Sequence, residues 1–142
     1  MAGKFGRIAH LKRDRKLEGE TGVDIKIDEN IYLSVLAATD ANTKWRELAQ
    51  KAVREVKRQE NAGAKREDLH ALMCKLYAET LVTGWRGVVD EHGKPVAFTP
   101  ANCTAFLIEA DDAYAAIERE CYDTQNFRAA RAEAIIETAK NA

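Results

Sequence analysis

Two adjacent amphipathic segments constrain the fold of this chain more than any other feature of its sequence. In residues 44–59, apolar residues recur at steps of three and four, and basic residues occupy much of the remaining circumference. These apolar positions are Trp45, Leu48, Ala49, Ala52, Val53 and Val56. Residues 66–83 repeat the pattern and are followed by Gly84, a helix terminator. Because only a short Asn-Ala-Gly break separates the two segments, we predict an antiparallel pair of helices.

A β-hairpin is predicted ahead of these helices. Residues 23–27 alternate apolar and polar side chains, which is the period of a half-buried strand. Residues 31–35 alternate in the same way and would complete a hairpin, although a helical turn also fits them. Asn42 and Thr43 then offer side chains that can cap the first helix.

The segment from Leu81 to Cys103 predicts a tightly turned connection between helices. Its acidic turn at residues 90–94 contains Gly and is typical of a solvated β-turn. Trp85 and Phe98 flank this turn, so we expect the two rings to be buried together. The connection ends at Thr99-Pro100, a side-chain cap followed by proline at the first helical position.

The C-terminal part predicts further helices. One begins after Thr99, a second begins at Asp111-Asp112, and a last one begins near Asp123, with Phe127, Ala130, Ala134 and Ile135 facing inward. The predicted fold class is therefore α+β and mainly α: a short N-terminal β-hairpin followed by a compact bundle of four to five helices. At 142 residues the chain suits a single domain, which we place at residues 23–142.

Charge is distributed unevenly, although the net charge is only −1. Residues 1–22 combine basic side chains with four glycines, which predicts a basic arm that is flexible when free. Residues 41–66 carry eight Lys or Arg against three Glu, whereas residues 109–137 carry eight Asp or Glu against three Arg. Such opposite poles favour head-to-tail self-association or binding of a charged partner.

Residues that could perform chemistry are sparse. His70 and Cys74 are four residues apart on one helical face, but zinc needs three or four ligands and no second pair accompanies them. Ser34 is the only serine and lacks the glycine elbow of a hydrolase. The three cysteines form no short paired spacing and are expected to be reduced. We therefore predict a protein without catalytic residues, cofactor or metal, and no apolar run approaches the length of a membrane span.

The candidate binding residues lie on the basic helix and among the large aromatics. We predict that a partner contacts Lys51, Arg54, Arg58, Trp45, Trp85 and Phe127. The same basic face could contact phosphates, but the balanced net charge and the missing aromatic stacking platform make nucleic-acid binding the weaker alternative.

These residues resemble a known family, the tail assembly chaperones of long-tailed bacteriophages. The matching parts are a strand pair ending near Asn42, the aromatic Trp45, the basic helix and the segment LYAETLVTGWRGVVDEHGKPVAFTPAN, residues 76–102. Asn126-Phe127-Arg128 completes the resemblance, which extends from about Val23 to Glu137. The chain departs from the family at Thr43, where proline is frequent, and in its longer, more basic arm.

The resemblance implies a non-catalytic protein that binds and solubilises the long helical tape measure protein and helps to recruit tail tube subunits. It also implies a self-associating protein that acts in the host cytoplasm during phage assembly. Two other interpretations stay open at this point: a structural component retained in the phage tail or neck, and a small nucleic-acid-binding regulator.

Overall fold

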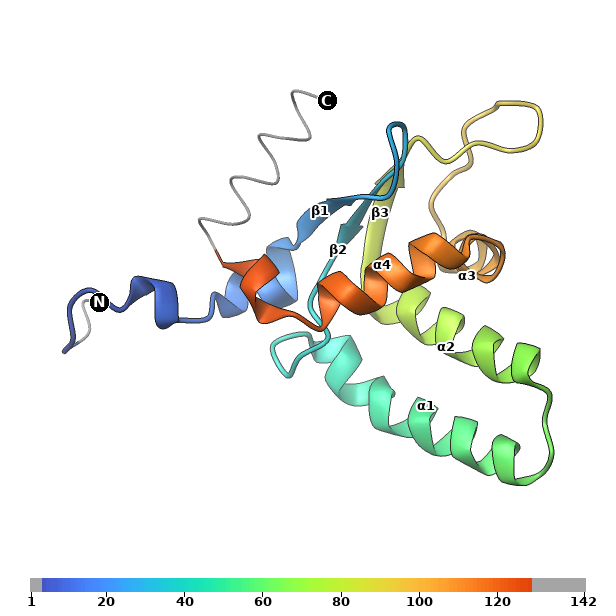
Figure 1. Ribbon diagram of the computed structural model, residues 1–142, viewed down its shortest axis with the longest axis horizontal. Coiled ribbons are helices and arrows are strands. Elements are labelled where there is room, and N and C mark those ends of the chain that lie inside the picture. Colours follow the sequence, from blue (N-terminus) through green and yellow to red (C-terminus); the bar gives the residue numbers. More distant parts are fainter. Residues whose placement is uncertain (1–3, 129–142) are drawn as a thin grey trace.

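The computed structural model describes residues 4–128, which form a small antiparallel sheet covered by helices (Figure 1). The sheet order is β1-β2-β3. The strands are β1 (Val23–Lys26), β2 (Tyr32–Val35) and β3 (Val82–Arg86). The helices are α1 (Thr43–Asn61), α2 (Arg66–Thr80), α3 (Pro100–Glu109) and α4 (Asp111–Cys121), with short helical turns at Ala9–Leu11, Leu17–Thr21 and Thr124–Phe127. The predicted class, α+β and mainly α, is confirmed.

The predicted hairpin is present as β1 and β2. Their register places Val23 opposite Val35 and Ile25 opposite Leu33, and all four side chains are buried. Residues 32–35 are therefore a strand and not the helical turn that their sequence also allowed. Because side chains alternate across a strand, this register places the apolar set of both strands on the face that the helices cover.

A third strand, β3, corrects the prediction that the second helix continues to Thr83 and ends at Gly84. The helix α2 ends at Thr80, and Gly84 lies within β3, opposite Ser34 of β2. The reason is the open edge of β2, which offers a hydrogen-bonding partner to a segment rich in β-branched and aromatic residues, Val-Thr-Gly-Trp. A run of apolar residues at the end of a helical pattern does not by itself distinguish the last helical turn from a strand.

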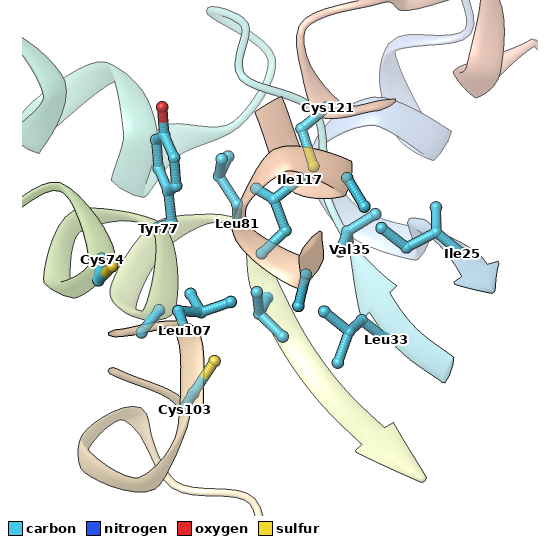
Figure 2. Close-up of a cluster of buried hydrophobic side chains, with 14 of the residues drawn as sticks. Ile25, Leu33, Val35, Cys74, Tyr77, Leu81, Cys103, Leu107, Ile117 and Cys121 are labelled. Carbon is cyan, nitrogen blue, oxygen red and sulfur yellow. The ribbon is translucent and has the colours of Figure 1, made fainter. Parts of the chain in front are cut away.

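The core lies between the sheet and the helices α2, α3 and α4 (Figure 2). Leu33 and Val35 of β2 face this core together with Leu107 of α3 and Ile117 of α4, and all four are fully buried. The three cysteines are free and buried in the same core. Burial raises the pKa of the Cys74 thiol to about 11 and that of Cys103 to about 12, so these groups stay protonated at neutral pH.

The starts of α3 and α4 follow the sequence prediction. Thr99 caps α3, with its Oγ1 accepting a hydrogen bond of 3.0 Å from the backbone N–H of Asn102, and Pro100 is the first helical residue. Asp111 and Asp112 occupy the first turn of α4, where the helix dipole favours negative charge. The last predicted helix is represented by the turn at Thr124–Phe127, and its remaining positions, including Ala130, Ala134 and Ile135, lie outside the described residues.

Part of the segment predicted as a free arm, residues 13–22, packs on the domain in the structure. Glu18 is fully buried and its carboxylate accepts two hydrogen bonds from Arg13, at 2.9 and 2.5 Å, and one of 2.7 Å from Thr39 Oγ1. The backbone carbonyl of Glu18 also accepts a bond of 2.8 Å from the Ala37 N–H. A buried carboxylate is stable only with such partners, which the linear sequence does not reveal.

The buried Glu18 predicts a specific pH dependence of stability. Its hydrogen bonds with Arg13 hold the pKa of Glu18 below the usual range. Because the folded-state pKa is lower than that of the unfolded chain, about 4.3, this stabilisation is complete above the unfolded value and is lost as pH falls through the folded value. We expect Glu18→Gln to lower the free energy of unfolding by about 2–3 kcal/mol at pH 7 and to flatten its decline below pH ~5.

Urea unfolding across this pH range would measure both effects. Asp40→Asn is the matched control, since Asp40 also pairs with Arg13, at 3.3 Å, but is exposed and should contribute little. Equal pH profiles for the wild type and Glu18→Gln would contradict the assignment.

Two glycines provide a second test of the fold. Gly87 has a φ of +84°, and an added Cβ would overlap the carbonyl oxygen of Asn30 in the β1–β2 connection. Gly63 has a similar φ of +87°, but no atom lies within 4 Å of its Cβ position. Both Ala substitutions incur the left-handed backbone cost of about 1–2 kcal/mol. Only Gly87→Ala adds a clash, so its thermal unfolding midpoint should fall well below that of Gly63→Ala. Equal midpoints would show that Gly87 does not lie as close to the β1–β2 connection as the structure places it.

Candidate partner-binding surface

The helices α1 and α2 form an antiparallel hairpin, in which α2 contributes to the core and α1 lies on its outer side (Figure 1). Among the described residues of α1, none is fully buried, although the helix has 19 residues and a clear apolar face. Leu48, Ala52 and Val56 are half-buried, and Val53 is 55% exposed. The helix therefore uses only part of its apolar surface against α2 and leaves the rest to solvent.

A shallow groove of about 240 Å³ lies between the two helices. Apolar side chains line it from both sides: Leu48 and Ala52 from α1, and Leu72 and Leu76 from α2. We call this the α1–α2 groove. It combines an apolar floor with a charged rim, which is the usual composition of a helix-binding groove.

The rim of the α1–α2 groove carries both signs of charge. Lys51 and Glu55 line it on α1, and Lys75 and Glu79 line it on α2. Glu55 accepts hydrogen bonds of 3.0 and 2.5 Å from Arg58, which lower its pKa to about 2, so this carboxylate is ionised at all physiological pH values. The rim is therefore a mixed polar border and not a uniformly basic surface.

The buried side chain of Asn42 sets the position of α1. Its Oδ1 accepts a hydrogen bond of 3.2 Å from the Trp45 N–H and so caps the helix, as the sequence predicted. Its Nδ2 donates to two backbone carbonyls, Ala37 at 3.1 Å and Thr80 at 2.7 Å. One amide thus connects the chain after β2, the start of α1 and the end of α2.

Aromatic rings support the same junction. The Trp45 ring lies 6.2 Å from that of Tyr77 on α2 and packs edge-on against Tyr122 at 5.6 Å. The Tyr77 hydroxyl donates a hydrogen bond of 2.8 Å to Glu118 of α4. Burial of the ring, together with this hydrogen bond, raises the pKa of Tyr77, so its hydroxyl stays protonated. The cluster fixes the first turn of α1 against α2 and α4, while the far end of the helical hairpin extends outward (Figure 1).

The structure places the predicted binding residues in three parts of the molecule: on α1, on β3 and in the core. Lys51 lies on the rim of the α1–α2 groove, Arg54 is exposed on the same helix, and Arg58 pairs with Glu55. Trp45 is half-buried at the base of that helix. Four of the six residues are therefore brought together on α1.

Trp85 and Phe127 lie elsewhere. Trp85 is on β3, where its ring packs edge-on against Phe98 at 5.2 Å and its Nε1 donates a hydrogen bond of 2.9 Å to the Val96 carbonyl. Trp85 and Phe98 are in contact as predicted, but both are half-buried rather than fully buried. Phe127 is fully buried in the core and offers no surface to a partner in this conformation. The assignment of these residues to partner binding stays a prediction.

Sequence reasoning did not identify the α2 side of the groove. Leu72 and Leu76 are four residues apart on the apolar face of the second helix, and the structure buries Leu76 in the core and leaves Leu72 half-buried. Their spacing places them on one face, but only the tertiary packing leaves part of that face open. One sequence signal could have indicated a groove. The apolar stripe on α1 is longer than the part of it that a single neighbouring helix can bury.

The other candidate sites have ordinary structural roles. Cys74 Sγ lies 3.5 Å from His70 Nε2, and the His70 ring packs against Tyr114 at 4.5 Å. Within residues 4–128, no group of three or more His, Cys, Asp or Glu side chains is placed to hold a metal ion. Asp90 accepts hydrogen bonds from the N–H groups of His92 and Lys94, at 2.8 and 3.0 Å, and so closes the predicted turn.

None of the helices in the described part of the chain has the length and apolar character needed to cross a membrane.

A family model described as YdaY prophage protein matches residues 38–139. The chain belongs to this YdaY prophage protein family. The matched region contains both helices of the α1–α2 groove and Asn42. Membership confirms the phage origin that the sequence resemblance implied, whereas the YdaY description names no role in tail assembly. No curated protein matches the chain, and no solved structure matches it.

The geometry of Asn42 in this YdaY family protein predicts which substitutions disturb the helical hairpin. Asn42→Ala removes a cap and leaves two carbonyl groups without their donor, so it should lower the free energy of unfolding by about 3–5 kcal/mol. Asn42→Asp retains the cap acceptor but cannot donate, and it should also be strongly destabilising. Thr99→Ala, which removes only the exposed cap of α3, should lower the free energy of unfolding by about 1 kcal/mol.

Thermal and urea unfolding of the three variants would compare these contributions. A cost for Asn42→Asp as small as that for Thr99→Ala would show that the two donated hydrogen bonds do not stabilise the junction.

Proposed function

We propose that this prophage protein is a non-catalytic tail assembly chaperone that holds helical segments of the tape measure protein in the α1–α2 groove. In this role it keeps the tape measure protein soluble in the host cytoplasm and helps to recruit tail tube subunits. The observation that supports the proposal is the open groove with an apolar floor between two helices. Binding of this kind requires burial of apolar surface and no bond breaking.

The form of the groove suits a helical partner. An amphipathic helix lays an apolar stripe into such a groove through residues at positions i, i+3, i+4 and i+7. Leu48 and Leu72, from opposite walls, would contact that stripe, and Lys51 and Glu79 on the rim would contact its polar flanks. Each apolar side chain fully buried on binding contributes about 1.5–3 kcal/mol before the cost of association.

The incomplete burial of α1 supports the same role. A monomer gains nothing from leaving Leu48 and Ala52, which line the groove, partly in solvent. A chaperone must expose apolar surface to replace the contacts that its client lacks before assembly. The family membership supplies a phage context, and the resemblance of residues 76–102 to tail assembly chaperones supplies the choice of client.

Groove blocking tests the proposal. Ala52→Trp should fill the α1–α2 groove, because Ala52 lines this groove and is only half-buried. After co-expression with the tape measure protein of the same prophage, the wild type should yield a soluble complex, and Ala52→Trp should reduce the co-purified partner about tenfold, which corresponds to about 1.4 kcal/mol. The matched control is Ala115→Trp, which makes the same change on the exposed face of α4 and should have no effect.

The outcome also distinguishes the two other functions. A wild-type protein that neither binds nor solubilises the tape measure protein would contradict the proposal. A stoichiometric band of this protein in purified particles would then indicate a structural component of the tail or neck. A salt-dependent shift of DNA by the wild type, abolished by reversing Lys51, Arg54 and Lys57 to Glu, would indicate a nucleic-acid-binding regulator.

A further inference from the structure

A second groove lies at a separate place in the fold, between the β1–β2 connection and the junction of α3 with α4. Its volume is about 470 Å³. Ile27 and Ile31 line it from the connection, and Phe106 lines it from α3. All three side chains are half-buried, so the floor of this groove is apolar and open to solvent.

Four carboxylates surround this apolar floor: Asp28, Glu109, Asp111 and Asp112. We call the site the acidic groove. None of the four forms an ion pair with another residue of the range 4–128. Asp28 accepts hydrogen bonds of 2.8 Å from the N–H groups of Asn30 and Ile31, which leaves its net charge in place. An occupant that covers this groove must therefore combine apolar side chains with positive charge.

The N-terminal segment of the same chain has this composition. Residues 4–12, Lys-Phe-Gly-Arg-Ile-Ala-His-Leu-Lys, contain three basic residues and no Asp or Glu. Phe5 is 72% exposed and Leu11 is 67% exposed, which are the highest values for large apolar side chains in residues 4–128. Lys4 and Arg7 flank Phe5, and neither forms an ion pair with another described residue. The segment therefore carries uncovered apolar surface and uncompensated positive charge together.

This segment does not occupy the acidic groove of its own chain. Arg128 Nη1 donates hydrogen bonds of 2.8 and 2.5 Å to the carbonyls of His10 and Lys12, and the Arg13–Glu18 pair fixes the chain immediately afterwards. From this anchor the segment leaves the molecule on the side away from the β1–β2 connection and the α3–α4 junction (Figure 1). A copy of the segment that reaches an acidic groove therefore comes from a second molecule.

We propose that residues 4–7 of one copy, which precede the anchored carbonyls of His10 and Lys12, dock in the acidic groove of a second copy, with Phe5 on the apolar floor and Lys4 and Arg7 facing Glu109 and Asp112. Each copy has one segment and one groove at different places, so the contact is heterologous and generates a ring or an open chain of copies. The inference goes beyond the proposed function and does not depend on it, because the contact uses neither α1 nor α2. A contact of this small size binds weakly, with a Kd on the order of micromolar to millimolar.

Charge reversal on the two sides tests the contact. Lys4→Glu/Arg7→Glu and Glu109→Lys/Asp112→Lys should each abolish self-association in sedimentation velocity, since each places like charges opposite one another. A chain that carries all four substitutions has opposite charges again and should associate as the wild type does. The wild type should form larger species at about 0.05 M salt and smaller ones at about 0.5 M salt, where charge attraction is screened.

Two control variants and one further test variant separate the contact from general effects. Lys65→Glu/Lys94→Glu changes the net charge equally at exposed positions elsewhere and should leave association unchanged. Phe5→Ala should weaken association at least tenfold, whereas Val89→Ala, at another exposed apolar residue, should not. Phe5→Ala and Val89→Ala both alter exposed side chains. Their comparison therefore tests the contact even if the charge reversal at Glu109 and Asp112 perturbs α4.

Three outcomes would overturn the proposed contact. A wild type that stays monomeric up to about 1 mM, the weak end of the range for small interfaces, would overturn it. Unchanged association of the Lys4→Glu/Arg7→Glu variant, or a four-substitution chain that folds but stays monomeric, would overturn it as well. Failure of tape measure binding in the groove-blocking experiment would leave this result unaffected, since the two grooves share no residue.

Discussion

The buried amide of Asn42 is the interaction on which the arrangement of the whole domain depends. It lies where three segments meet, and its Nδ2 bonds the carbonyls of Ala37 and Thr80 while its Oδ1 begins α1. Each carbonyl would otherwise be buried without a donor, at a cost of about 1–3 kcal/mol. This amide and the ring of Trp45 fix the first turn of α1, and the half-buried Leu48 and Ala52 pack the following turns against the rest of the domain. The α1–α2 groove lies between the two helices that this junction holds together.

Local patterns predicted most of the helical fold, because caps and apolar periodicity are properties of neighbouring residues. Asn42, Thr99 and Asp111 mark helix starts for reasons visible within four residues of sequence. The strand β3 was missed because its hydrogen bonds go to β2, about 50 residues earlier in the chain. The packing of residues 13–22 was missed for a related reason: the burial of Glu18 depends on Arg13 and on Thr39, and no short-range pattern connects those residues.

The candidate site was predicted only on one side. Residues of α1 were proposed because exposed basic side chains beside an apolar stripe are visible in the sequence; of these, Lys51 lies on the rim of the α1–α2 groove and Arg54 does not. Leu72 and Leu76 were not proposed as contacts, since an apolar residue gives the same signal whether a neighbour or a partner covers it. Phe127 shows the opposite case: an aromatic chosen as a contact is fully buried. Sequence specifies which face of a helix is apolar, and tertiary packing decides how much of that face stays uncovered.

The two grooves differ in charge and in position, so both can be occupied at the same time. The proposed self-association through the acidic groove would leave the α1–α2 groove of every copy open, so an assembly of copies would present a series of similar apolar grooves. A long helical client would then be held by many weak contacts, whose combined affinity greatly exceeds that of one because each further contact is intramolecular. Each contact is small and can be released singly as a stronger partner replaces it. Weak individual grooves on repeated copies would together supply what the proposed coating of a client requires, namely strong retention as a whole and easy displacement at each position.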